Sequence, residues 1–315
     1  MGRESKFVSA VVYIHNEQKN IGTYLGMLHS YLAENFTKYE IICVDDASSD
    51  NSVNLIRDIV KSNGFENVSL ISMSIFQGRE LGMEAGVDLS IGDYVYEFEW
   101  IDMKEMETYP NRLYDAYLKA TDGYDVVTYV SGENKGLGSV LFYKIYNKSN
   151  LSYTELTPER FRLVTRRAIN RVSNMNNSIV YRKALYANSG LSTCVIGSDS
   201  VNIVPEHKNV INNKTKIGMN ILLSYTGVIP KIATVIEMVL FSTFVISTVL
   251  VLNNSIDKTI AVPCVVFSFI GSAIGAMNLA QIKYNELLLE LSIKNKKYVV
   301  SSVEKLINSE KGQEK

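Results

Sequence analysis

Hydrophobic and polar positions change period repeatedly between Phe7 and Val130, and this pattern predicts alternating strands and helices. Short apolar runs rich in Val and Ile are typical of strands that are buried on both faces. The predicted strands are Phe7–Ile14, Tyr39–Val44, Val68–Met73, Tyr94–Phe98 and Val126–Val130. Segments with helical spacing lie between them, at Ile21–Tyr31, Ser52–Lys61, Gly78–Leu89 and Tyr109–Ala120. The alternation predicts an α/β fold, in which a mostly parallel sheet carries helices on both faces.

Two much longer apolar stretches follow, Ile232–Leu252 and Ile260–Ala280. Each has the roughly 20 residues that a membrane-spanning helix needs. The segment between them, Asn253–Thr259, is long enough only for a turn, so the two stretches predict a transmembrane hairpin. Two buried helices of a water-soluble protein are the alternative.

Lysines on both flanks of the predicted hairpin indicate its orientation. The turn contains only Lys258, whereas the flanks carry Lys208, Lys214, Lys216, Lys231, Lys283, Lys294, Lys296 and Lys297. Because positive flanks stay on the cytoplasmic side, we expect both termini in the cytoplasm and a multi-pass protein of the cytoplasmic (inner) membrane. Gly271 and Gly275 form a ridge of small residues that suits close packing, within the hairpin or between subunits of a homo-oligomer.

The pattern divides the chain into four parts. Residues 1–206 form the predicted α/β domain, 232–280 the two transmembrane helices and 281–315 a cytoplasmic tail. Residues 207–231 mix lysines with apolar residues, which predicts an interfacial amphipathic segment or a plain linker. We expect no signal peptide, because Met1–Lys6 is polar. A net charge of −1 argues against nucleic acid as a partner.

Acidic side chains follow three of the predicted strands. Glu17 comes after the first strand, Asp45 and Asp46 end the second, and Glu99 and Asp102 follow the fourth. The carboxyl ends of parallel strands meet at one edge of the sheet, where ligands bind. Converging carboxylates need a cation, hydrogen-bond donors or sugar hydroxyls to satisfy them. Mg²⁺ or Mn²⁺ bridging a diphosphate meets that need, so the sequence predicts a metal–nucleotide site.

Arg79 begins a predicted helix, where it is expected to hold a phosphate or pair with a carboxylate. Each candidate also has a purely structural explanation, which stays open at this stage. These explanations are helix capping for Asp45, Asp46 or Asp102, a helix-dipole contact for Glu17, a surface ion pair for Arg79 and a solvated strand end for Glu99.

Six motifs resemble those of family 2 glycosyltransferases, which have the Rossmann-like GT-A fold. They are VVYIHNEQKNI (11–21), IICVDDASSDNS (41–52), QGRELGMEAG (77–86), GDYVYEFEWID (92–102), GYDVVT (123–128) and FRLVTRRA (161–168). Together with the hairpin, they are similar to membrane-anchored polyprenyl-phosphate glycosyltransferases, such as dolichyl-phosphate mannose synthase and O-antigen glucosyl-carrier enzymes.

The resemblance implies a hexosyltransferase that uses a nucleotide-sugar donor and an undecaprenyl-phosphate-like acceptor for cell-envelope polysaccharide. It implies that Glu17, Asp45, Asp46 and Arg79 bind the donor. Glu99 takes the place of the first Asp of the family's Asp-x-Asp metal motif. Ile101 replaces the second, and Asp102 is the nearest substitute.

The acceptor phosphate is expected to attack the anomeric carbon directly, with inversion, so that positioning matters more than a strong base. The candidate catalytic residues are Glu99, Asp102 and Arg162, of which Glu99 and Asp102 are also the candidate metal ligands. Arg166, Arg182 and Lys216 are candidates for binding the lipid phosphate. Arg162 and Arg166 would share a face if their segment were helical. A basic patch that faces solvent or lipid headgroups is the alternative.

The altered metal motif also admits a second function. In that case the chain would be a catalytically inactive, membrane-anchored relative that binds nucleotide sugar or partners another transferase. A processive polysaccharide synthase is disfavoured, because two spans are too few to enclose a polymer channel.

Overall fold

A computed structural model describes residues 2–101, 103, 108–130, 142–144, 146–148, 155–156, 158–175, 181–197, 228–253, 258–292 and 298–306. Within these residues the strands form one eight-stranded sheet of order β7-β5-β6-β4-β1-β2-β3-β8. The strands are β1 (Glu4–Ile14), β2 (Phe36–Asp45), β3 (Val68–Met73), β4 (Tyr94–Phe98), β5 (Val126–Val130), β6 (Phe161–Thr165), β7 (Thr193–Gly197) and β8 (Val300–Leu306). The sheet is mixed but mostly parallel, since only β6 and β8 run antiparallel to their neighbours.

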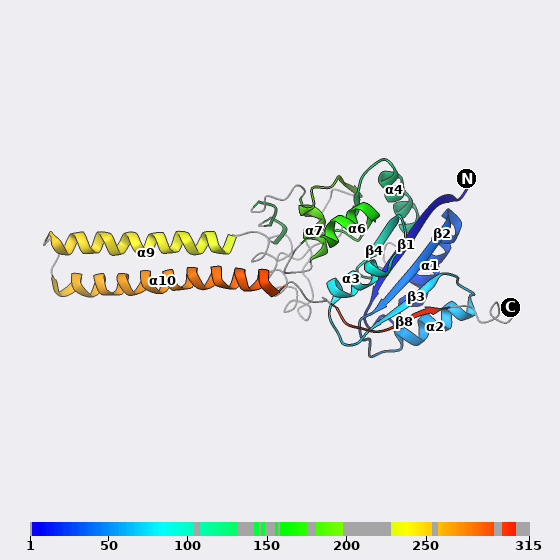
Figure 1. The fold of residues 1–315 in the computed structure, drawn as a ribbon, viewed down its shortest axis with the longest axis horizontal. Coiled ribbons are helices and arrows are strands. Elements are labelled where there is room, and N and C mark those ends of the chain that lie inside the picture. The colour runs from blue at the N-terminus through cyan, green and yellow to red at the C-terminus, as the bar shows by residue number, and fades with distance from the viewer. Residues whose placement is uncertain are drawn as a thin grey trace.

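Helices cover both faces of the sheet, as the sequence predicts (Figure 1). They are α1 (Ile21–Asn35), α2 (Ser52–Ser62), α3 (Arg79–Leu89), α4 (Tyr109–Thr121), α6 (Arg166–Ser173) and α7 (Arg182–Asn188). Alternate residues of β1 point to opposite faces. Ala10 and Val12 pack into one core with α1, α2 and α4, whereas Val11 packs into a second core with α3, α6 and α7.

Helix α3 lies unusually close to the sheet because glycines face it. A side chain at Gly86 would collide with Val11 and would lie 2.7 Å from Cγ2 of Val44. At Gly82 it would lie 2.9 Å from the Tyr13 ring. This close packing fixes the first residue of α3, Arg79, above the carboxyl edge of β1 and β2.

Most predicted elements are confirmed, and three strands, β6, β7 and β8, are new. The bounds of β3, β4 and β5 match the prediction, while β1 and β2 begin earlier. Strand β6 lies in a segment whose arginines suggested a helix, and that helical interpretation is wrong for Arg162. Strand β8 comes from the segment expected to be a tail and pairs antiparallel with β3, at the edge of the sheet.

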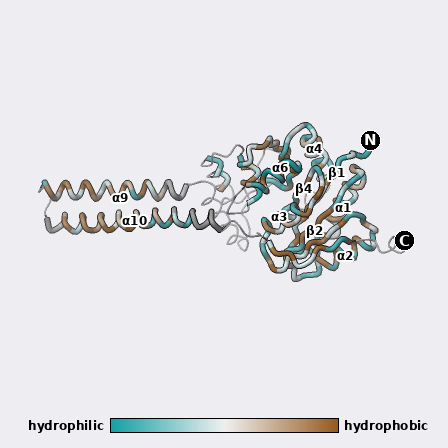
Figure 2. Tube along the Cα trace, viewed as in Figure 1, coloured by the Kyte–Doolittle hydropathy of each residue, from teal (hydrophilic) through white to brown (hydrophobic). Residues whose placement is uncertain are grey.

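The two apolar stretches form α9 (Val228–Leu252) and α10 (Lys258–Ser292), which project side by side from the sheet domain (Figure 1). Hydrophobic residues extend along much of both helices (Figure 2). Ala233–Leu250 and Val265–Ile282 are long and apolar enough to cross a membrane, and 0% and 6% of their residues are buried. They therefore do not form core helices.

The small-residue ridge of α10 faces α9. The Cβ position of Gly271 lies 3.7 Å from Leu240, and that of Gly275 meets the Glu237 side chain. Packing within the hairpin thus accounts for the ridge, while the homo-oligomer stays a prediction. The flanking residues 208, 214, 216, 294, 296 and 297 lie outside the described residues, so the orientation of the hairpin also stays a prediction.

Candidate functional site

Two loops are joined at the carboxyl ends of β1 and β2. The Oδ1 of Asn16 accepts a hydrogen bond from the backbone N–H of Ser49 at 2.8 Å, and the backbone N–H of Glu17 donates to Oγ of Ser52 at 2.8 Å. The half-buried Glu17 carboxylate accepts from Asn20 Nδ2 at 3.1 Å. The Asp-Asp-x-Ser turn and the Asn-Glu pair therefore form one platform.

Asp45 ends β2 with an acceptor that has no partner. Its side chain is buried, and Oδ2 accepts from the Ser48 N–H at 3.3 Å. The buried Oδ1 has no hydrogen-bond partner among the described residues. Burial raises the pKa of Asp45, although the hydrogen bonds from Ser48 act against it. A buried acceptor without a donor costs free energy, so Oδ1 is a natural position for a ligand hydroxyl or N–H.

Asp46 supports the loop that leads into α3. Its Oδ1 accepts from the N–H of Gln77 at 2.8 Å, and its Oδ2 accepts from the N–H of Gly78 at 2.8 Å and from Tyr13 OH at 2.7 Å. Gly78 has φ +91°, a backbone conformation that other residues rarely adopt. Asp46 is thus fully engaged, and its contacts set the position of the next residue, Arg79.

Arg79 and Lys183 both lie over the ring of Trp100, which directly follows Glu99. The Arg79 Cζ is 4.5 Å from the ring centre and the Lys183 Nζ is 5.4 Å from it. Such cation–π contacts hold a charged side chain without neutralising it. The buried Nε of Arg79 and Nε1 of Trp100 have no hydrogen-bond partner in the described part of the chain.

A buried ion network surrounds Arg162, which lies opposite Glu97 in the β4–β6 register. Its Nη1 is 2.8 Å from Glu97 Oε2, its Nε donates to Glu159 Oε1 at 2.8 Å, and its Nη2 contacts both Glu99 and Glu159. All four side chains are at most 7% exposed. One guanidinium is thus shared by three buried carboxylates, so further cations are needed to balance their charge.

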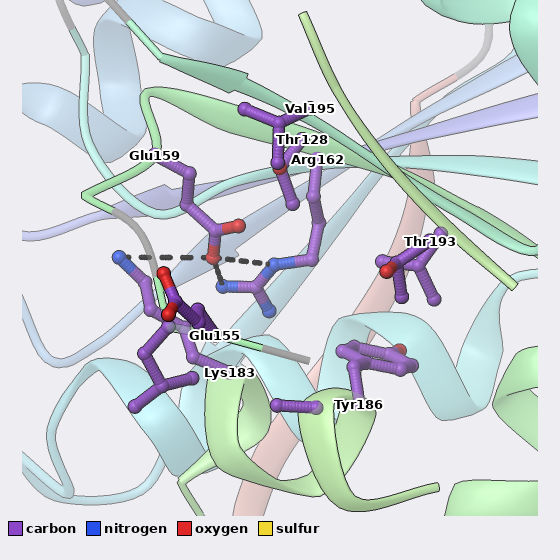
Figure 3. A pocket seen from close by; sticks show the side chains of 11 residues that line it. Thr128, Glu155, Glu159, Arg162, Lys183, Tyr186, Thr193 and Val195 are labelled. Atoms are coloured by element: carbon purple, nitrogen blue, oxygen red, sulfur yellow. Dashed lines mark hydrogen bonds and ion pairs between the residues drawn. The ribbon is translucent and has the colours of Figure 1, made fainter. Parts of the chain in front are cut away.

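The beginning of α7 completes this network. Arg182 Nε donates to Glu97 Oε2 at 3.0 Å, and the same carboxylate accepts from Tyr186 OH at 2.8 Å. Lys183 Nζ lies 3.6 Å from Glu159 Oε1 (Figure 3). The backbone N–H of Arg182 donates to Glu80 Oε2 at 3.0 Å, which links α7 to α3.

The network separates the pKa values of two neighbouring carboxyls. Burial alone would raise the pKa of Glu99, but the charges of Arg162, Lys183 and Arg79 outweigh it and lower the pKa to about 2. Burial, together with the charge of Glu99, raises the pKa of Glu80 to about 7. Glu99 is therefore a permanent anion at neutral pH, whereas Glu80 titrates near it.

A small cavity borders the network between α7 and strands β5 and β7 (Figure 3). Its volume is about 40 Å³, enough for water but far too small for a nucleotide sugar. The buried Oγ1 of Thr128, which lines it, has no partner among the described residues. The open carboxyl edge, and not this cavity, is therefore the candidate donor site.

The described residues do not fit a divalent cation. They contain no group of three His, Cys, Asp or Glu side chains placed to hold a metal ion. Glu99 is already bound by a guanidinium, and Ile101 packs against the hydrophobic core. A cation at Glu99 would have to displace Arg162 or lie against its positive charge. Asp102, the other predicted ligand, lies outside the described residues.

Of the three candidates for the lipid phosphate, the two that the structure describes, Arg166 and Arg182, are not brought together. Arg166 lies at the far end of β6, where its backbone N–H donates to Asp93 O at 2.9 Å and its Nη2 to Gly92 O at 2.8 Å. This is the amino end of β4, opposite the edge that carries Glu99. Arg182 is buried in the ion network, and Lys216 lies outside the described residues.

Four charged residues of the network and one aromatic residue were not found from the sequence: Glu80, Glu97, Glu159, Lys183 and Trp100. Of these, Glu97 could have been identified from the sequence, because Glu97 and Glu99 are two residues apart at the end of a strand, so their side chains lie on the same face. The others come together only through tertiary contacts.

Comparisons with known proteins indicate the class of the domain. Residues 9–137 match the family described as glycosyl transferase family 2. An uncharacterized glycosyltransferase of Synechocystis is 24% identical over 188 residues, which are 57% of each chain. The undecaprenyl-phosphate 4-deoxy-4-formamido-L-arabinose transferase of Aeromonas hydrophila is 31% identical over 122 residues, 39% of this chain and 36% of that one. The Pseudomonas fluorescens protein of the same name is 30% identical over 123 residues, 39% of this chain and 35% of that one.

A mannosyltransferase from Pyrobaculum calidifontis, solved in complex with GDP-Man and Mn²⁺, has a similar structure, with TM-score 0.47 and 14% identity over 70% of this chain and 63% of that one. Residues 9–137 thus carry a glycosyl transferase family 2 domain. The chain spans between about one third and just over half of the length of the curated relatives named above.

Proposed function

We propose that this protein transfers a sugar from a nucleotide-sugar donor to a polyprenyl phosphate at the cytoplasmic face of a membrane. The family 2 domain and the names of the undecaprenyl-phosphate transferases support the reaction class. The two exposed apolar helices support a membrane location, because a lipid-linked acceptor requires a site close to the bilayer.

The donor is proposed to lie across the carboxyl ends of β1, β2 and β4. Asp45 and Glu17 accept hydrogen bonds from its nucleoside, and Asp46 holds the loop from which Arg79 reaches the diphosphate. The unpartnered Oδ1 of Asp45 is the observation that carries this assignment, because it is a buried acceptor at the edge where ligands of such sheets bind.

The reaction is proposed to be a single displacement with inversion. An oxygen of the acceptor phosphate forms a bond to the anomeric carbon, while the bond from that carbon to the donor's β-phosphate oxygen breaks. The acceptor phosphate is already an anion, so the protein mainly has to align both substrates and stabilise the departing diphosphate. The assignment of Arg166, Arg182 and Lys216 to the acceptor phosphate stays a prediction, as does the role of Asp102.

Lipid mass spectrometry tests the proposal. Membranes that contain the full chain are incubated with undecaprenyl phosphate and a panel of nucleotide sugars, and the extracted lipids are analysed for a polyprenyl-phosphate-linked sugar. We expect a product with one donor and a strong loss of it in Asp45→Ala, but not in Lys119→Gln, which changes an exposed side chain of α4. Absence of product with every donor would contradict the proposal.

The inactive relative remains the second candidate, because Glu99 is held in an ion pair and Ile101 replaces a metal ligand. It predicts that nucleoside diphosphates bind to the carboxyl edge although no donor yields product.

A further inference from the structure

The first turns of α3 and α7 place two cations, Arg79 and Lys183, near Glu99, the residue that takes the place of the first Asp in the family's metal motif. Arg79 makes no ion pair with a carboxylate within the described residues, and its buried Nε has no partner. Lys183 is 7% exposed, and its Nζ lies 3.6 Å from the carboxylate of Glu159, beyond ordinary hydrogen-bond distance. Both lie over the Trp100 ring, which orients them. Together with Arg162 and Arg182 they supply four cations around the three carboxylates of Glu97, Glu99 and Glu159, which leaves one positive charge in excess.

The carboxylate at this position already has a cation in direct contact. Glu99 contacts the guanidinium of Arg162, which also holds Glu97 and Glu159. A divalent cation would gain little from a carboxylate in this state, and it would be repelled by Arg162 and Arg79. The local charge balance therefore favours an anionic ligand beside Trp100 over a metal ion.

We propose that Arg79 and Lys183 bind the donor diphosphate directly, with the indole N–H of Trp100, and thereby replace a divalent cation. This inference rests on the proposed function and adds the way in which the leaving group is held. When the bond from the anomeric carbon to the β-phosphate oxygen breaks, its electron pair remains on the diphosphate, whose negative charge increases by one. The two cations stabilise that charge, and the new bond to the acceptor phosphate completes the transfer without a metal.

The chain contains its own reporter for this site, because Trp100 is its only tryptophan. The experiment titrates detergent-solubilised full chain with UDP, GDP, CDP, ADP and TDP and follows tryptophan fluorescence. Each titration is done once with excess EDTA and once with Mg²⁺. We expect one nucleoside diphosphate to change the fluorescence, with dissociation constants that agree within about twofold in the two conditions.

Substitutions identify the groups responsible. Arg79→Gln and Lys183→Gln are each expected to weaken metal-free binding about tenfold or more, and Arg79→Lys to recover part of the loss. Arg57→Gln and Lys119→Gln are the matched controls, because both side chains lie outside the site, and their affinity should equal that of the parent chain. Thermal unfolding of each variant shows whether the buried Lys183 substitution has disturbed the fold.

The outcomes separate the inference from the proposed function. Binding that requires Mg²⁺ in the unsubstituted chain overturns the inference and leaves the proposed function standing. Absence of binding by every nucleoside diphosphate, in both conditions, overturns the proposed function as well. The comparison of EDTA with Mg²⁺ needs no variant, so a misfolded substitution does not affect it.

Discussion

The ends of β2 and β4 both carry buried carboxylates, yet their surroundings differ. At β2, Asp45 is hydrogen-bonded by Ser48, and its Oδ1 has no partner among the described residues. At β4, Glu99 and Glu97 are bound by arginines that come from β6 and α7. The first end is suited to binding a ligand, whereas the second is a structural ion network whose cations face the ligand site. Similar residues at similar places in a sheet therefore have different surroundings, because distant segments supply their partners.

Among the substitutions that distinguish the end of β2 from the end of β4, Arg162→Met is expected to cause the largest loss in the free energy of unfolding. This substitution leaves Glu97, Glu99 and Glu159 buried without their central cation, and loss of one partner of a buried ion pair costs about 3–5 kcal/mol. Chemical denaturation of the solubilised chain measures the change in the free energy of unfolding. Lys119→Met, on the exposed side of α4, is the control, and an equally small loss in both variants would contradict the structural role of the network.

The pH dependence of stability tests the same network. The pKa of Glu80 is raised to about 7 in the folded chain, so the folded form binds its proton more tightly than the unfolded form. This contribution to stability is present below the unfolded pKa of about 4.3 and is lost as the pH rises through about 7. Glu80→Gln should therefore become progressively more stable than the parent chain over that interval, by at most about 3 kcal/mol.

Unfolding midpoints of both chains, measured from pH 5 to pH 8 in steps of about one pH unit, give this difference directly. Glu99 has the opposite effect on stability. Its folded pKa of about 2 lies below the unfolded value, so its contribution to stability is present at neutral pH and is lost only in acid. A difference between the two chains that stays constant across the interval would show that Glu80 does not titrate there.

Asp45→Asn is expected to affect binding more than stability. The substituted amide keeps the size of the side chain, and the buried Oδ1 has no hydrogen bond to the described residues that could be lost. Nucleoside diphosphate affinity should fall about tenfold or more, as expected for a lost hydrogen bond to a charged group, while the free energy of unfolding changes by less than about 1 kcal/mol. Glu99→Gln should instead change the free energy of unfolding more than it changes nucleoside diphosphate affinity. Fluorescence titration and denaturation of the two variants give both quantities, and a large loss of stability in Asp45→Asn would refute the distinction.

The sequence predicts the β2 end better than the β4 end for a physical reason. The platform around Asp45 is built from contacts within and between two adjacent loops, so its residues form contiguous motifs. Glu97 and Arg162 are 65 residues apart, and Gln77 and Val299, which share two hydrogen bonds, are 222 residues apart. Periodicity identifies β3, β4 and β5, but it does not show that β6 lies antiparallel between β4 and β5 or that β8 pairs with β3. The cations that neutralise Glu99 were therefore not predictable from local patterns.

The smallest effect is expected at the other edge of the sheet, where Arg57 binds Glu304 of β8. Its Nη2 and Nε lie 2.8 Å and 3.1 Å from the two carboxylate oxygens, a two-pronged geometry as close as that of the buried network. The side chains are, however, 40% and 38% exposed. Water and salt screen such a pair, so Arg57→Met should cost only about 0.2–1 kcal/mol and less at high salt. Denaturation at two salt concentrations measures this loss. A loss as large as that of Arg162→Met would mean that geometry, and not burial, decides the energy of both pairs, and the contrast between the ends of β2 and β4 would then need another explanation.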